Sequence, residues 1–213
     1  ESNQIPYMVF INKMDRTATL MRELLPAMQD VASTPLLITQ VPIRDGEDVT
    51  GYVDLITETA YHYNQGEASD VVEMPDSVKE REEEARTMML EALADFDDDL
   101  MMKLLEDEIP SIEEVVGDLR VAFTESKIAP VLIGAAELEN GVRRLLQEIV
   151  EWIPGPEGHA ARHGLDGAGA AQVLKTFNTQ HGGKLSLVRV WRGPIKDGET
   201  VNGERIGGVY RML

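Results

Sequence analysis

The apolar and polar positions of the first forty residues alternate between strand-like and helix-like patterns. Residues 7–11 form an unbroken apolar run bounded by Pro6 and Asn12, which predicts a strand buried on both faces. Apolar residues recur at helical spacing over residues 18–31, and residues 36–41 are again strand-like. Strand, helix and strand in this order predict an α/β fold with a parallel sheet, in which residues 12–15 follow the carboxyl end of a strand.

The pattern changes after residue 43. Two segments, residues 50–55 and 60–63, alternate as antiparallel strands do, and residues 75–125 carry the periodicity of three amphipathic helices. Ser111 and Glu114 have the spacing of a capping box at the start of the third helix. This region is therefore predicted to be an α+β subdomain inserted into the parallel sheet.

The parallel sheet is expected to resume at the apolar segment 129–133, which a helix ending near Trp152 follows. Residues 154–170 are rich in Gly, Ala and Pro, which is typical of a linker, and strand-like segments dominate from residue 172 onward. We divide the chain into 1–42 and 128–153 of one domain, an insertion at 43–127, a linker at 154–170, and the beginning of an antiparallel β barrel at 171–213.

Composition narrows the function further. The formal net charge of −18 argues against wrapping nucleic acid or binding an anionic membrane, and favours a basic partner surface. The chain has no cysteine, which excludes disulfides and thiolate metal sites and is compatible with a cytoplasmic location. Apolar runs are too short to predict a membrane span. Both ends look cut, because core-like strands begin or stop there, so we expect a segment of a longer protein.

The segment Asn12-Lys13-Met14-Asp15 has the form N-K-x-D, which is typical of guanine recognition. Guanine offers two adjacent donors, N1–H and the N2 amine, and the two oxygens of the Asp15 carboxylate can accept both. The Asn12 amide can contact the purine edge or brace the neighbouring loop, and the Lys13 stem can lie over the base. The alternative is a polar turn that Asp15 caps.

A second small-residue loop, Gly134-Ala135-Ala136, follows the strand before the last helix of this domain. Small side chains allow the main chain itself to approach a base, so Ala135 and Ala136 are the second predicted guanine-binding segment. By itself, such a sequence is also compatible with a close-packed turn.

These motifs and several others resemble elongation factor G, in the same order along almost the whole chain. The matching segments are 6–16, 40–43, 50–54, 94–97, 130–134, 140–142, 153–156, 183–190 and 193–198. The resemblance implies a P-loop-GTPase-like partial parallel sheet, the G′ insertion, and the start of the β-barrel domain II. It also implies a cytoplasmic translocation factor that binds GTP or GDP with Mg²⁺ and acts on the ribosome, domain II contacting small-subunit RNA.

The sequence departs from that family in two ways. Ala135 stands where the family usually has serine, which removes a hydroxyl that helps to fix the loop. The chain also has no P-loop, no switch threonine segment and no D-x-P-G-H motif, so we assign no catalytic residue and no metal ligand. We expect the chain alone to hold no cofactor and to hydrolyse no GTP.

Acidic residues dominate the predicted helices between residues 76 and 118, and such a run is often only a solvated surface. The resemblance implies that the first of these helices binds the lysine-rich stalk protein of the ribosome, with Glu80, Glu83, Glu84 and Glu91 as the contacting residues. Two other functions stay open: a ribosomal-protection or release-factor GTPase, and a non-catalytic ribosome-binding module.

Overall fold

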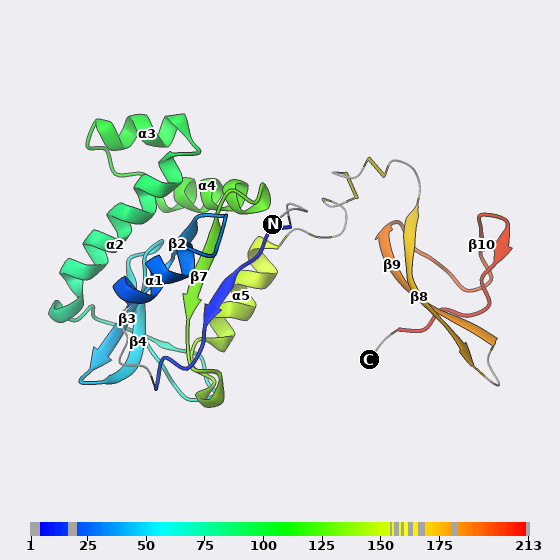
Figure 1. The fold of residues 1–213 in the computed structure, drawn as a ribbon, viewed down its shortest axis with the longest axis horizontal. Helices are drawn as coiled ribbons and strands as arrows, with labels where there is room; N and C mark the ends of the chain where they lie inside the picture. Colours follow the sequence, from blue (N-terminus) through cyan, green and yellow to red (C-terminus); the bar gives the residue numbers. More distant parts are fainter. Residues whose placement is uncertain are drawn as a thin grey trace. The chain divides into compact units, whose positions relative to one another are not determined.

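The computed structural model describes residues 5–16, 21–153, 155, 158, 160–161, 164–165, 169–179 and 183–211 (Figure 1). The chain divides into two compact units, residues 1–153 and 154–213. Much of the predicted linker, including residues 156–157 and 166–168, lies outside the described residues. Helices and both parallel and antiparallel sheets are present, so the predicted α/β class is confirmed.

A three-stranded parallel sheet forms the centre of the first unit. Its order is β1-β7-β2, with β1 at Val9–Ile11, β7 at Ala129–Ile133 and β2 at Leu36–Ile38. Val131 in the central strand lies opposite both Val9 and Ile38. The strands that flank the predicted insertion at 43–127 thus meet side by side, as the apolar runs in the sequence predict.

The two faces of this sheet are covered by different helices. Helix α1 (Met21–Gln29) packs Leu25 and Met28 near Leu36 on one face. On the other face, Leu37 belongs to the main core, which includes Trp152 at the end of α5 (Val142–Trp152). Successive residues of a strand point to opposite faces, which is why Leu36 and Leu37 join different clusters.

A second sheet is antiparallel, with the order β3-β4-β5-β6. Its strands are β3 (Gln40–Asp45), β4 (Asp48–Asp54), β5 (Thr59–His62) and β6 (Asp70–Val72). The predicted single strand over residues 36–41 is wrong, because the chain leaves the parallel sheet at Thr39 and enters the antiparallel sheet at Gln40. Thr39 fixes this corner: its amide and its hydroxyl both donate to the Val131 carbonyl, at 3.3 and 3.2 Å.

Three helices follow the antiparallel sheet along the chain, as predicted; the first packs against strand β3, and the other two pack against the first (Figure 1). They are α2 (Asp76–Ala94), α3 (Asp98–Leu105) and α4 (Ile112–Thr124). The capping box is confirmed, since the Ser111 hydroxyl accepts from the Glu114 amide and the Glu114 carboxylate accepts from the Ser111 amide. The shared core combines strand residues such as Val53 and Leu55 with Phe123 of α4.

The second unit contains two antiparallel pairs among its described residues. The long strands β8 (Ala170–Thr179) and β9 (Gly183–Arg192) pair with each other, as do the short β10 (Thr200–Val201) and β11 (Glu204–Arg205). Across the described part of the whole chain, every helix is too short or too polar to cross a membrane.

Candidate functional site: two loops at the ends of parallel strands

The loop with the N-K-x-D motif begins directly after β1, and the loop Gly134–Ala136 begins directly after β7. Because β1 and β7 are parallel neighbours, with Ile11 opposite Ile133, both loops leave the sheet at the same edge. Two main-chain hydrogen bonds connect the segments where the loops begin. The Gly134 amide donates to the Ile11 carbonyl at 3.0 Å, and the Met14 amide donates to the Gly134 carbonyl at 3.1 Å.

Asn12 provides a third connection through its side chain. Its Oδ1 accepts from the amide of Ala136, 124 residues away, at 2.9 Å, and also from the amide of Lys13 at 2.8 Å. Lys13 has a φ of 63°, so the chain turns sharply there and its side chain stays exposed. The sequence left two roles open for Asn12, contact with the purine edge and bracing of the neighbouring loop. In the structure its side chain braces the neighbouring loop.

Asp15 lies at the surface end of the loop, with 20% of its side chain exposed. Its Oδ2 is 3.3 Å from Nε of Arg16, and the same guanidinium pairs with Glu137 in the second loop. The carboxylate therefore remains accessible to a ligand while Arg16 links the two loops electrostatically. No sequence motif indicated the pairing of Arg16 with Glu137.

Ala135 and Ala136 differ in their surroundings. Ala135 is 4% exposed, and its amide and carbonyl both pair with Asn140, which closes the loop on itself. Ala136 is exposed and begins a short 3₁₀ turn, η1 (Ala136–Leu138). Of the two, only Ala136 is exposed, and its amide is the group that donates to Asn12.

Two glycines allow this loop to be so tight. A β-carbon on Gly134 would lie 2.4 Å from the Asn140 carbonyl and 2.5 Å from the Phe10 ring, so no larger residue fits. Gly141 has a φ of +76°, and a β-carbon there would meet the Ile133 carbonyl at 2.5 Å. Both positions need glycine for close approach, and Gly141 needs it for its backbone conformation as well.

Residues of the antiparallel sheet also reach these loops, which the sequence analysis missed. Met14 is 1% exposed and packs with Tyr52, Tyr63 and Ile133. Gln40, 2% exposed, accepts a bond from the Ile133 amide at 3.0 Å. A glutamine within the mostly apolar run of residues 36–43 was the available signal, because a buried amide needs a specific partner.

A buried charge cluster ties α5 to the antiparallel sheet. Arg144 of α5 pairs with Asp54 at 2.7 Å and with Glu148 at 2.6 Å. The other Asp54 oxygen accepts from the amides of Ile56 and Thr57, both at 3.0 Å. Burial raises the pKa of Glu148 to about 7, although Arg144 opposes that shift.

The predicted partner-binding glutamates all lie on α2 and are exposed. They are Glu80, Glu83, Glu84 and Glu91. Glu82, between them in sequence, is 7% exposed and faces inward, close enough to Glu58 and Arg86 for those charges to affect its pKa, which burial raises. The exposed carboxylates therefore form an outward acidic surface, distinct from the buried charges of the same helix.

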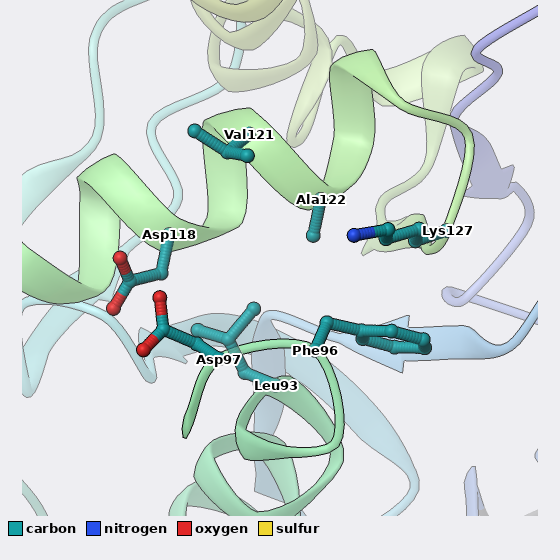
Figure 2. Close-up of a pocket in the computed structure, with 7 residues that line it drawn as sticks. All are labelled: Leu93, Phe96, Asp97, Asp118, Val121, Ala122 and Lys127. Carbon is teal, nitrogen blue, oxygen red and sulfur yellow. The ribbon is translucent and has the colours of Figure 1, made fainter. Parts of the chain in front are cut away.

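One cavity lies away from the loops, between the end of α2 and α4. Figure 2 shows the carboxylates of Asp97 and Asp118 facing each other at one end, with Phe96 and Lys127 at the other. Its volume is about 60 Å³, far below the several hundred Å³ of a typical small-molecule site. It is too small to hold a nucleotide, and no group of three or more potential metal ligands gathers among the residues described.

Two similar proteins show what the chain resembles. The chain is 46% identical to an elongation factor G-like protein of Synechocystis sp., over 98% of this chain and 32% of that protein. It also matches a crystal structure of a Thermus thermophilus protein with a TM-score of 0.76 and 30% identity, over 92% of this chain and 29% of that one. No protein-family profile matches. The chain spans about a third of the length of the relatives it matches.

Proposed function

Because this chain belongs to the elongation factor G-like family, a family of translation GTPases, we propose that it supplies the guanine-recognising part of the nucleotide site. The longer protein would bind GTP or GDP, and residues outside this chain would hold Mg²⁺ and the phosphates. Within this chain, Asn12, Lys13, Asp15 and Ala136 would surround the base, and Ala135 would close the second loop behind Ala136.

The observation that carries this proposal is the bond from the Ala136 amide to Asn12 Oδ1 at 2.9 Å. It joins two loops that lie far apart in sequence, at the carboxyl ends of adjacent parallel strands, where α/β sheets bind ligands. One loop offers the accessible carboxylate of Asp15, and the other places the exposed Ala136 beside it. A base held between them would meet an acceptor pair on one side and the small-residue loop on the other.

Donor and acceptor matching explains why the base would be guanine. The Asp15 carboxylate has only acceptors, and guanine presents two donors side by side at N1 and N2. Adenine has no such pair, and hypoxanthine lacks the N2 amine. Each charge-assisted bond contributes about 1.5–3 kcal/mol, so losing one weakens binding by roughly ten- to a hundredfold.

Competition binding with the longer protein tests the proposal. Fluorescent GDP should be displaced best by GDP, less well by IDP and least by ADP, in the presence of Mg²⁺. Because all three competitors are diphosphates, their phosphate contacts are the same, and differences in displacement report on the base alone. Equal displacement by GDP and IDP would contradict recognition of the N2 amine and remove Asp15 from the site.

We propose a second function for the acidic surface of α2: binding a lysine-rich partner, by family resemblance the stalk protein of the ribosome. Four exposed glutamates on one helix provide the charge complementarity, and the net charge of −18 adds a long-range attraction for basic surfaces. Ribosome binding in general, including contact of the second unit with small-subunit RNA, and a cytoplasmic location are proposed on the same family ground.

Salt dependence and charge reversal test that function. Association with the purified stalk protein should slow as salt rises, because exposed charges are screened within about 10 Å at 0.1 M ionic strength. The double variant Glu83→Lys, Glu84→Lys should lower the association rate more than the control variant Glu106→Lys, Glu108→Lys. The control pair lies just after α3 and changes the net charge by the same amount. If both pairs have the same effect, only net charge matters and α2 is a solvated surface.

A further inference from the structure

We propose that the antiparallel sheet β3-β4-β5-β6 is a structural part of the guanine site, with Gln40 as the residue that positions the Gly134–Ala136 loop. This inference rests on the proposed guanine recognition, and it concerns residues that no nucleotide-binding motif contains. Its basis is the way in which three residues of the antiparallel sheet and its edge, Gln40, Tyr52 and Tyr63, contact the two loops.

Gln40 completes the parallel sheet after its own strand has left it. The pairing of β2 with β7 places Ile38 opposite Val131, so a continued strand would place residue 40 opposite Ile133. The chain instead turns at Thr39 into β3. The Gln40 side chain then supplies the carbonyl oxygen that a continued strand would have supplied, accepting from the Ile133 amide at 3.0 Å.

That bond is buried and lies one residue before the loop. Gln40 is 2% exposed and Ile133 is 1% exposed, so water cannot replace the acceptor without opening the sheet. The next residue, Gly134, bonds with its amide to Ile11 at the end of β1 and with its carbonyl to Met14 in the N-K-x-D loop. Displacing Ile133 would therefore move both loops relative to each other.

Tyrosines of the same region support the other loop. Met14 packs in one cluster with Tyr52 and Tyr63, whose rings lie 5.6 Å apart. The Tyr63 hydroxyl donates to the Ile133 carbonyl at 3.5 Å, which is long for a hydrogen bond. This weak contact orients the Tyr63 ring toward the end of β7. Met14 lies between Lys13 and Asp15 in the sequence. The tyrosine rings that pack on Met14 therefore fix the position of these two base-binding residues relative to the sheet.

Hydrogen exchange in the 213-residue chain tests the positioning directly, without nucleotide. In Gln40→Met, which keeps size and removes the acceptor, the Ile133 amide should exchange at least about tenfold faster while Val131 stays protected. Gln29→Met is the matched control. Gln29 is a half-buried glutamine that accepts from the Leu36 amide at 2.7 Å, at the opposite end of the parallel sheet.

Base discrimination in the longer protein tests the consequence. The ratio of IDP to GDP dissociation constants should fall at least about threefold in Gln40→Met and stay unchanged in Gln29→Met, because misplaced groups lose selectivity before they lose phosphate binding. Tyr63→Phe, which keeps the ring packing, should reduce the ratio in the same direction. A purely structural loss would lower the affinity for both nucleotides equally.

The outcomes separate this inference from the function on which it rests. If the unaltered protein does not distinguish IDP from GDP, guanine recognition itself is wrong. If it does distinguish them and Gln40→Met keeps the full ratio, the antiparallel sheet is not part of the site. Unchanged exchange at Ile133 in Gln40→Met would overturn the positioning role independently of any nucleotide.

Discussion

Individual residues at the two loops are constrained by the lack of space around them. Gly134 and Gly141 approach each other closely across the loop, and most of their near neighbours are main-chain atoms that cannot move aside. The sequence indicated a small-residue loop here, but the identity of its tightest points required the positions of Phe10 and Asn140. Motif spacing along one segment carries no information about which distant groups approach it.

Gly141→Ala is expected to destabilise the chain by about 2–4 kcal/mol, because it combines a left-handed φ with a clash against the Ile133 carbonyl. Gly117→Ala is the control. Gly117 lies inside α4 with open space around its α-carbon, so alanine there should stabilise by about 0.5–1 kcal/mol. Urea unfolding of both variants measures the difference, and two effects of the same sign would contradict the geometry.

Among the helices and strands, the sequence predicted those that are determined by residues close together in the chain. The three helices of the insertion and the capping box of α4 follow from periodicity and spacing, and all are present. The division of residues 36–41 between two sheets could not be predicted, because Leu36 to Val41 is suited to a strand throughout. Only the long-range bonds of Thr39 and Gln40 to β7 determine where one sheet ends and the next begins.

Helix α5 and strand β4 are joined by the Asp54–Arg144–Glu148 cluster, which predicts a pH dependence. Burial raises the pKa of Glu148 from 4.5 to about 7 in the folded chain. The folded state therefore binds a proton that the unfolded state releases between these values. Stability from this group is fully present below pH 4.5 and is lost as pH rises through 7, a change of up to about 3 kcal/mol.

Glu148→Gln should flatten this dependence between about pH 5 and pH 8, since glutamine does not ionise. Urea unfolding at both pH values, for this variant and the unaltered chain, gives the measurement. Glu151→Gln is the comparison, an exposed glutamate of the same helix that pairs with Arg120 at 3.4 Å. If the curves of Glu148→Gln and the unaltered chain remain parallel, Glu148 is ionised throughout and Arg144 outweighs its burial.

For the whole chain, the proposed function means that the base-recognising side of a nucleotide site is present without a phosphate-loop motif in the sequence. Most nucleotide affinity comes from phosphates held by backbone amides, a helix N-terminus and a metal ion. Calorimetry with the isolated chain should therefore show GDP binding weaker than about 1 mM. Micromolar binding would mean that these two loops suffice, and the proposed division of the site would be wrong.

The proposed recognition of guanine by Asp15 can be tested by replacing one of its two acceptor oxygens with a donor. In Asp15→Asn of the longer protein, an N–H₂ donor would face the N2 amine of guanine, whereas xanthine has an oxygen there. GDP affinity should fall at least about tenfold and XDP affinity should rise. Asp45→Asn, at the exposed end of β3, should change neither. Unchanged GDP affinity in Asp15→Asn would reduce the motif to a polar turn.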